Sequence, residues 1–507
     1  MDQKPNIVFI FIESFDGRKI GCLGNDAMKK STPNMDRMAR EGTIFTNMYC
    51  NNPVCCPVRA NLWTGAHTFQ TEGWNNYKGL EPGTKRFQHI LKDAGYEFAS
   101  KKGGYGKHDY VSGRHTVMCR FASWVSPVNI KAPVYRQSEP KVSFWPVKKT
   151  NGIDWFDVKR SKRFLKKQAA KGAGDTSNPF FLYLSLRAPH PKFYTTKHWY
   201  NKIDKAAVKI PKQYEQKHPV MEYQRVSKNW QHGFDEETVR KTRAIYYAMI
   251  SETDAMIGEV MDELKKRGLD ENTYVVVAGD HGENGLEHGM YYKMNMYESS
   301  AKVPLIIKGP GVEKGKIADK IVSTVDLMPT FLDMAGLETD NIKERYDMPF
   351  EAQGESLLPF LKGKTEDTRD WAFSMFTGST INTSIYMIRK GKWKYIAYPG
   401  YPPQLFDLET DPDELDNLAE AKPEIVDKLD KDLREVVDYD EVHKKWVKYC
   451  RESLVQFKKD CANGKINYRK WGTYIRHASY DEVIKAVYVD YKDTYKQRIE
   501  EFINQKE

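Results

Sequence analysis

Two adjacent cysteines, Cys55 and Cys56, are followed by Pro57 and then by Arg59. A thiol becomes a good nucleophile when a nearby cation or a helix N-terminus favours its thiolate form. A helix is expected to begin at these cysteines, with Arg59 one turn later. The stretch is therefore a candidate for thiolate chemistry, and a buried structural pair of cysteines is the alternative.

Other ionisable residues follow apolar runs that are typical of buried strands. These residues are Glu13, His190, Asp280 and His281. Because ligands collect at the carboxyl ends of the strands in open α/β sheets, we expect these side chains at one edge, with Lys107 and Lys293 reaching it from loops. A thiolate among carboxylates is electrostatically unfavourable, whereas oxygen ligands suit a hard divalent cation. The pattern indicates a calcium or magnesium site.

Apolar runs alternate with helical patterns along the first part of the chain. The predicted strands are 6–12, 179–185 and 273–279. The predicted helices are 34–41, 59–65, 85–94 and 236–266. This alternation favours a doubly wound α/β sheet.

The pattern changes after Gly363. Residues 385–396 read as two short strands around a Lys-Gly turn, and a charged helical tail follows 405–408. We expect a catalytic domain at 1–368 and a smaller α+β domain with an antiparallel sheet at 369–507.

Composition restricts the partners of the chain. Hydrophobic residues make up 40% and charged residues 29%, and no apolar run approaches the roughly 18 residues of a membrane span. The formal charge of +10 favours anionic partners such as sulfated or carboxylated sugars. No nucleic-acid-binding motif accompanies it, and the cations at 159–171 are interpreted as a solvated helix face.

The stretch from Cys55 to Gly65 resembles the C-x-P-S/A-R signature of type I sulfatases, with Val58 in place of the usual serine or alanine. In that family the first cysteine of the signature is oxidised to formylglycine, which would be residue 55 here. The resemblance continues along most of the chain, through 13–18, 106–107, 188–190, 280–282, 293–298 and 405–412. It implies an alkaline-phosphatase-like mixed sheet with helices on both faces.

The resemblance also implies a role for each candidate residue. One Ca²⁺ would be held by Glu13, modified Cys55, Asp280 and His281, although His281 could instead touch the nucleophile or the sulfate. Arg59 would stabilise the aldehyde hydrate, and Lys107 and Lys293 would grip sulfate oxygens. His190 would protonate the leaving oxygen.

Within the family the chain is most similar to uronate-2-O-sulfatases, through the segments 14–18, 74–80, 106–115 and 292–298. Asp109 stands where other sulfatases usually have histidine, as it does in that group. The candidates for sugar recognition are Arg114, His115, Trp74, Asn76 and His288. Trp74 could instead be a core residue, and His288 a brace within its loop.

The sequence thus predicts a sulfatase that removes the 2-O-sulfate of a uronic acid from a glycosaminoglycan or similar polysaccharide. Its further partner would be a formylglycine-generating or anaerobic sulfatase-maturating enzyme. The resemblance implies an exported or lysosomal protein, and we expect the sequence to be the mature form, because an apolar strand follows Met1 almost at once and leaves no room for a signal peptide. The alternatives are a phosphodiesterase or phosphonate monoester hydrolase of the same superfamily, and a non-catalytic binder of sulfated glycans.

Overall fold

The computed structural model describes residues 4–99 and 140–475 together with Asn504, except for short gaps at 77, 146, 172–177, 213–217, 229, 231–232, 365–368, 379–380, 464–467 and 471–472. In this part of the chain, seven strands form one large sheet in the order β3-β5-β1-β7-β8-β2-β9, called the central sheet below. Its strands are β1 (Asn6–Ile12), β2 (Thr43–Tyr49), β3 (Glu97–Ala99), β5 (Phe180–Leu186), β7 (Thr273–Gly279), β8 (Lys302–Lys308) and β9 (Lys316–Ser323). β8 runs antiparallel to both of its neighbours, β7 and β2, so the sheet is mixed.

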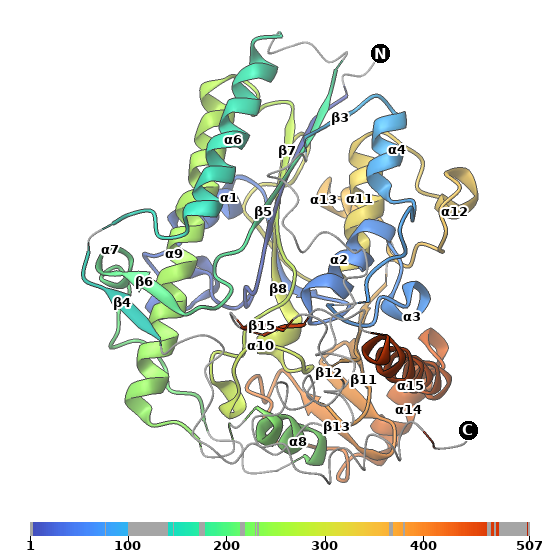
Figure 1. Cartoon of the computed structure of the whole chain (residues 1–507). Coiled ribbons are helices and arrows are strands. Elements are labelled where there is room, and N and C mark those ends of the chain that lie inside the picture. The colour runs from blue at the N-terminus through green and yellow to red at the C-terminus, as the bar shows by residue number, and fades with distance from the viewer. Residues whose placement is uncertain are drawn as a thin grey trace.

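Helices cover both faces of the central sheet (Figure 1). One face carries α1 (Pro33–Glu41), α6 (Gly152–Ala169) and α9 (Glu236–Lys266). The other face carries α2 (Cys55–Thr64), α4 (Phe87–Asp93) and α11 (Leu327–Met334). This arrangement confirms the predicted doubly wound mixed sheet.

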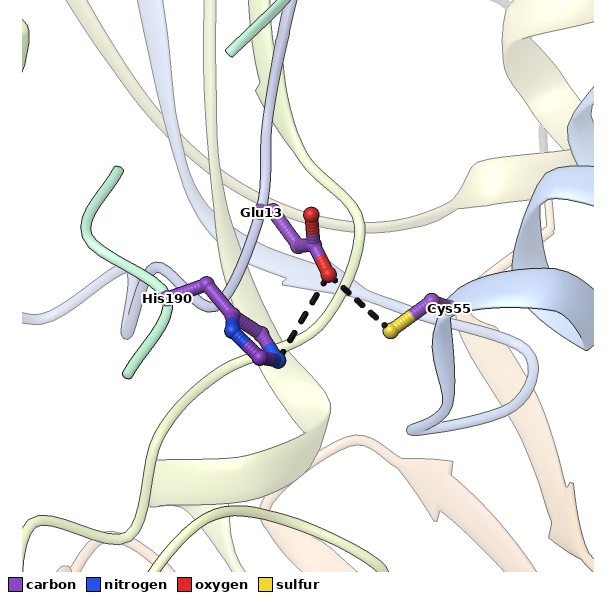
Figure 2. A group of neighbouring side chains, drawn as sticks. All are labelled: Glu13, Cys55 and His190. Atoms are coloured by element: carbon purple, nitrogen blue, oxygen red, sulfur yellow. Dashed lines mark hydrogen bonds and ion pairs between the residues drawn. The ribbon is translucent and has the colours of Figure 1, made fainter. Parts of the chain in front are cut away.

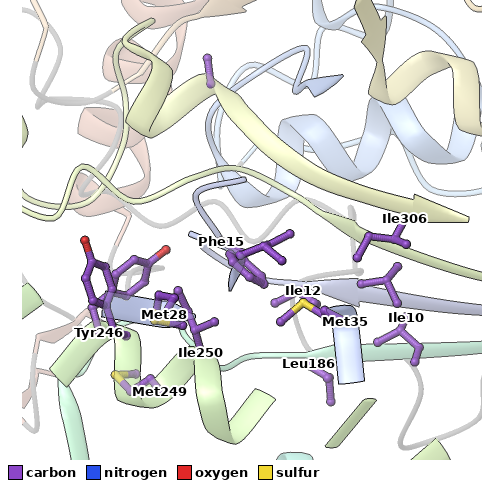
Figure 3. Packing of buried hydrophobic residues seen from close by; sticks show 14 of the residues in the cluster. Ile10, Ile12, Phe15, Met28, Met35, Leu186, Tyr246, Met249, Ile250 and Ile306 are labelled. Atoms are coloured by element: carbon purple, nitrogen blue, oxygen red, sulfur yellow. The ribbon is translucent and has the colours of Figure 1, made fainter. Parts of the chain in front are cut away.

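Successive residues of β1 feed the two cores alternately, as the pleat of a strand requires. Val8, Ile10 and Ile12 belong to the core beneath α1 and α9. Ile7, Phe9 and Phe11 belong to the core on the other face. Figure 3 shows the first of these cores, where Ile10 and Ile12 pack near Met35 and Leu186. A continuous apolar run therefore produces a strand that is buried on both sides.

A second, antiparallel sheet follows, called the C-terminal sheet below. Among the described residues it consists of β10 (Trp371–Phe376), β11 (Ile385–Lys390), β12 (Trp393–Tyr398) and β13 (Tyr401–Asp407), in that order. The helices α14 (Pro423–Val436) and α15 (Tyr439–Ala462) pack on one of its faces through Leu433 and Trp446. The predicted hairpin at 385–396 is thus β11 and β12. The predicted domain boundary after residue 368 stays a prediction.

β10 of the C-terminal sheet lies beside β2 and β9 of the central sheet. Backbone N–H of Met375 donates to Asn51 O over 3.0 Å, and Asn51 Nδ2 donates to Phe373 O over 2.8 Å. The remaining elements are α3 (Thr68–Thr71), β4 (Lys141–Ser143), β6 (Tyr194–Thr196), α7 (Lys197–Tyr200), α8 (Pro219–Ser227), α10 (Glu298–Ala301), α12 (Ile342–Arg345), α13 (Leu358–Leu361), β14 (Tyr468–Lys470) and β15 (Thr473–Ile475). Within the described ranges, none of the helices has the length and apolar character needed to cross a membrane.

Candidate active site

The site is built where three neighbouring strands of the central sheet end. β1 lies between β5 and β7, and Ile12 is level with both Leu186 and Gly279. Glu13 and Asp280 therefore leave the sheet side by side, since Asp280 N donates to Ile12 O over 2.9 Å. The expected meeting of the strand ends is confirmed.

The turn after β1 aims the Glu13 side chain. Ser14 has φ of +63°, a left-handed conformation that residues other than glycine rarely adopt. Its backbone is held from two sides: Ser14 N donates to Asp280 Oδ1 over 3.0 Å, and Tyr246 Oη of α9 donates to Ser14 O over 2.8 Å. Tyr246 also accepts from Asp16 N, so a buried helix residue fixes the whole turn.

Cys55 begins α2 and points into the cluster formed by these strand ends. Its Sγ lies 3.2 Å from Glu13 Oε1 and 3.2 Å from His281 Nε2. Figure 2 shows Cys55, Glu13 and His190 converging from three separate parts of the chain. The thiol is almost fully enclosed, because all ten residues of α2 are buried.

The surroundings favour the neutral thiol of Cys55. Burial raises the pKa of Cys55, the positive charge of Lys293 opposes the rise, and the carboxylates of Glu13 and Asp280 add to it. The thiolate interpretation is therefore disfavoured by the geometry.

His281 presents a neutral ring to residue 55. Its Nδ1 donates to Gly282 O over 3.0 Å, which leaves the Nε2 lone pair facing Cys55 Sγ. Burial lowers the pKa of His281 to about 4. The imidazole is therefore an acceptor at neutral pH.

Arg59 anchors Asp280 below the cluster. Arg59 Nη2 lies 3.1 Å from Asp280 Oδ2, and Nη1 donates to Tyr183 Oη and Ser185 Oγ, each over 3.0 Å. The side chain is 1% exposed. Tyr183 and Ser185 stand two positions apart on β5, so both side chains face the same side of the sheet. The sequence analysis did not identify these two residues as partners of Arg59.

Lys293 is a buried ammonium without a hydrogen-bond partner among the described residues. Its side chain is 4% exposed, and its charge acts on both Cys55 and His281. Burying a charge without a partner is costly, so such a group indicates a site for an anion. The structure brings this predicted residue to the cluster.

His190 lies at the rim, partly exposed. Its Nδ1 donates to Pro191 O over 2.7 Å, and its Nε2 lies 3.6 Å from Glu13 Oε1. Nε2 therefore faces the Glu13 carboxylate, while Nδ1 is used as a donor. The loop that bears His190 is held by Asp154 of α6, whose Oδ2 accepts from Arg187 N and Ala188 N over 2.9 and 2.8 Å.

Two groups of side chains could hold a metal ion within the described residues. Glu13, Cys55 and His190 form one, and Cys55, Asp280 and His281 form the other, with ligand atoms within 4.8 Å of one another in each group. Asp280 Oδ1 accepts from Ser14 N and His281 N, whereas Oδ2 accepts only from Arg59 among the bonds described and keeps a lone pair for a cation. The buried hydroxyl of Ser14 also lacks a partner in the described structure. These oxygen donors fit a hard cation.

The sugar-recognition residues give a mixed result. Lys107, Arg114 and His115 lie outside the described residues. The Trp74 indole is 1% exposed and packs with Phe373 in the core, so the proposed sugar-stacking face is corrected: Trp74 is a core residue.

Asn76 and His288 are placed by local contacts. Asn76 Oδ1 accepts from Cys56 N over 2.9 Å, so Asn76 braces the start of α2. His288 is 7% exposed and stacks on Tyr297 with ring centroids 3.8 Å apart. Burial lowers the pKa of His288 to about 4, which keeps the ring neutral. The brace interpretation of His288 agrees with these contacts.

The chain matches known proteins over most of its length. Residues 5–337 match the family model described as Sulfatase, and residues 286–439 match the model described as N-sulphoglucosamine sulphohydrolase, C-terminal. Arylsulfatase K from Bos taurus is 36% identical over 482 residues, which cover 90% of this chain and 85% of the relative. The chain belongs to the sulfatase family. This sulfatase is therefore a sulfuric ester hydrolase.

Further relatives and solved structures agree with this assignment. Arylsulfatase K from Danio rerio is 35% identical over 532 residues, covering 99% of this sulfatase and 95% of the relative. The phosphonate monoester hydrolase of Agrobacterium radiobacter shares the fold with a TM-score of 0.67 at 22% identity, over 85% of this chain and 95% of that one. A structure described as a 2-O GAG sulfatase shares it with a TM-score of 0.62 at 23% identity, over 85% and 92% of the two chains. At these identities the two structures show the fold alone.

Proposed function

We propose that this sulfatase hydrolyses the 2-O-sulfate ester of a uronic acid in a glycosaminoglycan or similar glycan, with residue 55 oxidised to formylglycine. One observation carries the proposal: Cys55 is enclosed between Glu13 and His281, with the buried Lys293 ammonium acting on it. The motif around Cys55 and the likeness to arylsulfatase K support the modification. The resemblance to uronate-2-O-sulfatases supports the substrate.

An aldehyde hydrate at residue 55 would supply the oxygen that attacks sulfur and would later release sulfate. The residues around it would perform the proton transfers. His281 Nε2, which is neutral and faces position 55, would accept a proton from the group there. Glu13 lies equally close and would share that role.

Lys293 and His190 would act on the substrate. Lys293 has no hydrogen-bond partner among the described residues, so its ammonium is available to bind a sulfate oxygen as a charge-assisted donor. His190 would donate its Nε2 proton to the leaving sugar oxygen. Arg59 would act through Asp280 by fixing that carboxylate.

Calcium would fit beside residue 55. Glu13, Asp280 and modified residue 55 would contribute oxygen ligands, and the ion would offset the negative charge of the sulfate. His281 is given the proton-acceptor role in place of a ligand role, because its Nε2 has one lone pair. Lys107, Arg114 and His115 stay predictions for sulfate and carboxylate recognition. A maturating enzyme as partner, and export or delivery to a lysosome, belong to the same proposal.

The test uses protein co-expressed with a maturating enzyme. Mass spectrometry of the peptide containing residue 55 should show a loss of about 18 mass units relative to cysteine, a value that follows from the elementary composition of the modification. This protein should cleave 4-nitrophenyl sulfate much faster than bis-4-nitrophenyl phosphate, and should prefer 2-O-sulfated uronate disaccharides over isomers sulfated elsewhere.

Three results would contradict parts of the proposal. Preference for the phosphate diester would favour the phosphodiesterase alternative. Binding without turnover by fully converted protein would favour a non-catalytic glycan binder. Preference for 6-O-sulfated hexosamine would refute the uronate assignment and leave the sulfatase assignment intact.

A further inference from the structure

The loop between β7 and α10 carries Lys293 in an unusual backbone conformation. Tyr292 and Met294, on either side of Lys293, have φ of +67° and +83°. Residues with a side chain rarely adopt such angles, because the Cβ atom crowds the backbone. The conformation persists only where the surroundings impose it. Contacts outside the loop must therefore hold Lys293 in place.

Two side chains from outside hold the backbone just after Lys293. Gln224 Nε2 of α8 donates to Met294 O over 3.0 Å. Lys394 Nζ, from β12 of the C-terminal sheet, donates to Met296 O over 2.9 Å. Lys394 is 0% exposed. The loop that presents Lys293 is thus bonded to a sheet that contributes none of the catalytic candidates found in the described residues.

Lys394 is itself fixed by two buried carboxylates. Its Nζ lies 2.7 Å from Glu298 Oε1 and 2.7 Å from Glu414 Oε1. Glu414 Oε2 also accepts from Glu298 N over 2.6 Å, at the start of α10. Glu298 is the last residue of the family motif that begins at Lys293. Its carboxylate forms ion pairs with Lys394 and Lys302. The motif therefore joins a site lysine to a buried charge network.

The network crosses from one sheet to the other. Tyr49 Oη of β2 lies 3.2 Å from Glu298 Oε2 and accepts from Arg389 Nε of β11 over 3.1 Å. Glu298 therefore receives contacts from both the central and the C-terminal sheet. These contacts can therefore fix the loop that carries Lys293 relative to both sheets.

We propose that Lys394 is a positioning residue, through which the C-terminal sheet fixes the backbone that presents Lys293 to the sulfate. The inference rests on the proposed role of Lys293 in sulfate binding. It gives the C-terminal sheet a part in substrate affinity, beyond packing against the central sheet. A purely structural role would predict a loss of stability and an unchanged site.

The experiment separates these two roles. Lys394→Met alone would remove the cation that Glu298 and Glu414 share, leave Glu298 with Lys302 only, and could prevent folding. The test variant is therefore the neutral triple substitution Lys394→Met, Glu298→Gln, Glu414→Gln, which retains the side-chain volumes. The control is Leu433→Ala. Leu433 of α14 is buried where that helix packs on the C-terminal sheet, and its truncation destabilises the protein without touching the network.

Two measurements are made on full-length protein matured at residue 55. The first is the KM and kcat for 4-nitrophenyl sulfate, and the second is amide hydrogen exchange across residues 290–296. The triple variant should raise KM about tenfold, as expected for one weakened charge-assisted bond, with a smaller change in kcat. It should also exchange faster across 290–296. Leu433→Ala should lower thermal stability and change neither value.

Wild-type KM and wild-type exchange in the triple variant would overturn the inference. So would the same KM and exchange changes in Leu433→Ala at an equal loss of thermal stability. If the matured wild-type protein fails to cleave sulfate esters, the proposed function is wrong, and the exchange data alone then decide whether Lys394 holds the loop.

Discussion

Two buried lysines, about equally enclosed, have opposite surroundings in this sulfatase. Lys394 is 0% exposed, donates to Glu414 Oε1 and Met296 O, and pairs with Glu298 Oε1 at 2.7 Å. Lys293 is 4% exposed and makes no hydrogen bond within the described structure. The fold fully accounts for the first lysine. The second is the lysine that we propose binds the sulfate.

The titratable groups beside the two lysines also differ in their pKa values. Although burial opposes it, the positive charges of Lys394 and Lys302 bring the pKa of Glu298 well below its usual value. Glu414, which shares Lys394 with Glu298, has its pKa raised to about 7 by burial. Near Lys293, burial raises the pKa of Cys55 and lowers that of His281 to about 4, so both groups stay neutral. Lys394 thus shares its charge with Glu298 and Glu414, whereas the groups beside Lys293 are neutral.

The largest effect is expected from Cys55. Cys55→Ala in matured protein should lower kcat for 4-nitrophenyl sulfate at least about a thousandfold, because the nucleophile is lost while the rest of the site remains. Cys56→Ala is the matched control, since the neighbouring thiol contacts Asn76 O over 3.7 Å. It should keep activity within a few-fold. Equal activity of Cys55→Ala and the wild type would refute the nucleophile assignment.

His190→Ala tests the rim of the site. We expect kcat to fall about a hundredfold or more on a sugar sulfate, because an alcohol leaving group needs its proton. The fall should be much smaller on 4-nitrophenyl sulfate, whose leaving group departs without protonation. Thermal stability should change little, since His190 is partly exposed. Equal losses on both substrates would contradict a role in proton donation.

Paired substitutions of the two lysines test the comparison directly. Lys394→Met should lower the free energy of unfolding by about 3–5 kcal/mol, because it removes the buried cation that Glu298 and Glu414 share. Lys293→Met should preserve or slightly raise that free energy, because it removes a buried ammonium that makes no hydrogen bond within the described residues. Chemical denaturation of both variants measures the difference. Similar losses from the two substitutions would show that Lys293 is also a structural cation.

The smallest effect concerns His67, a buried neutral group outside both clusters. Burial lowers the pKa of His67 to about 3, and neither ring nitrogen has a hydrogen-bond partner in the described structure. Below about pH 6.5 His67 is therefore protonated in the unfolded chain but not in the folded chain. The free energy of unfolding falls as the pH is lowered from there toward 3.

His67→Phe removes this titration without losing a hydrogen bond. Relative to wild type, the variant should gain about 2 kcal/mol in free energy of unfolding between pH 7.5 and pH 5, at roughly 1.4 kcal/mol per pH unit. Denaturation curves at both values provide the measurement. A difference between the two proteins that does not change with pH would contradict the assignment.

Local patterns determined much of this molecule. The apolar runs at 6–12, 179–185 and 273–279 became β1, β5 and β7 within one residue at each end, and the helix predicted at 236–266 was found with the same bounds. The gathering of Glu13, Asp280 and His281 followed from general properties of parallel sheets. Residue periodicity and strand termini are encoded by neighbouring residues, so a single sequence reveals them.

Other features depend on residues that are far apart in the sequence. The antiparallel direction of β8, the left-handed turn at Ser14 under Tyr246, and the burial of Trp74 against Phe373 were not predictable from any local pattern. The same holds for the difference between Lys293 and Lys394. The sequence alone determined the strands, the cysteine motif and the candidate site residues. Only the tertiary structure decided which buried lysine is paired, because a charge is satisfied by whatever the fold brings within about 3 Å of it.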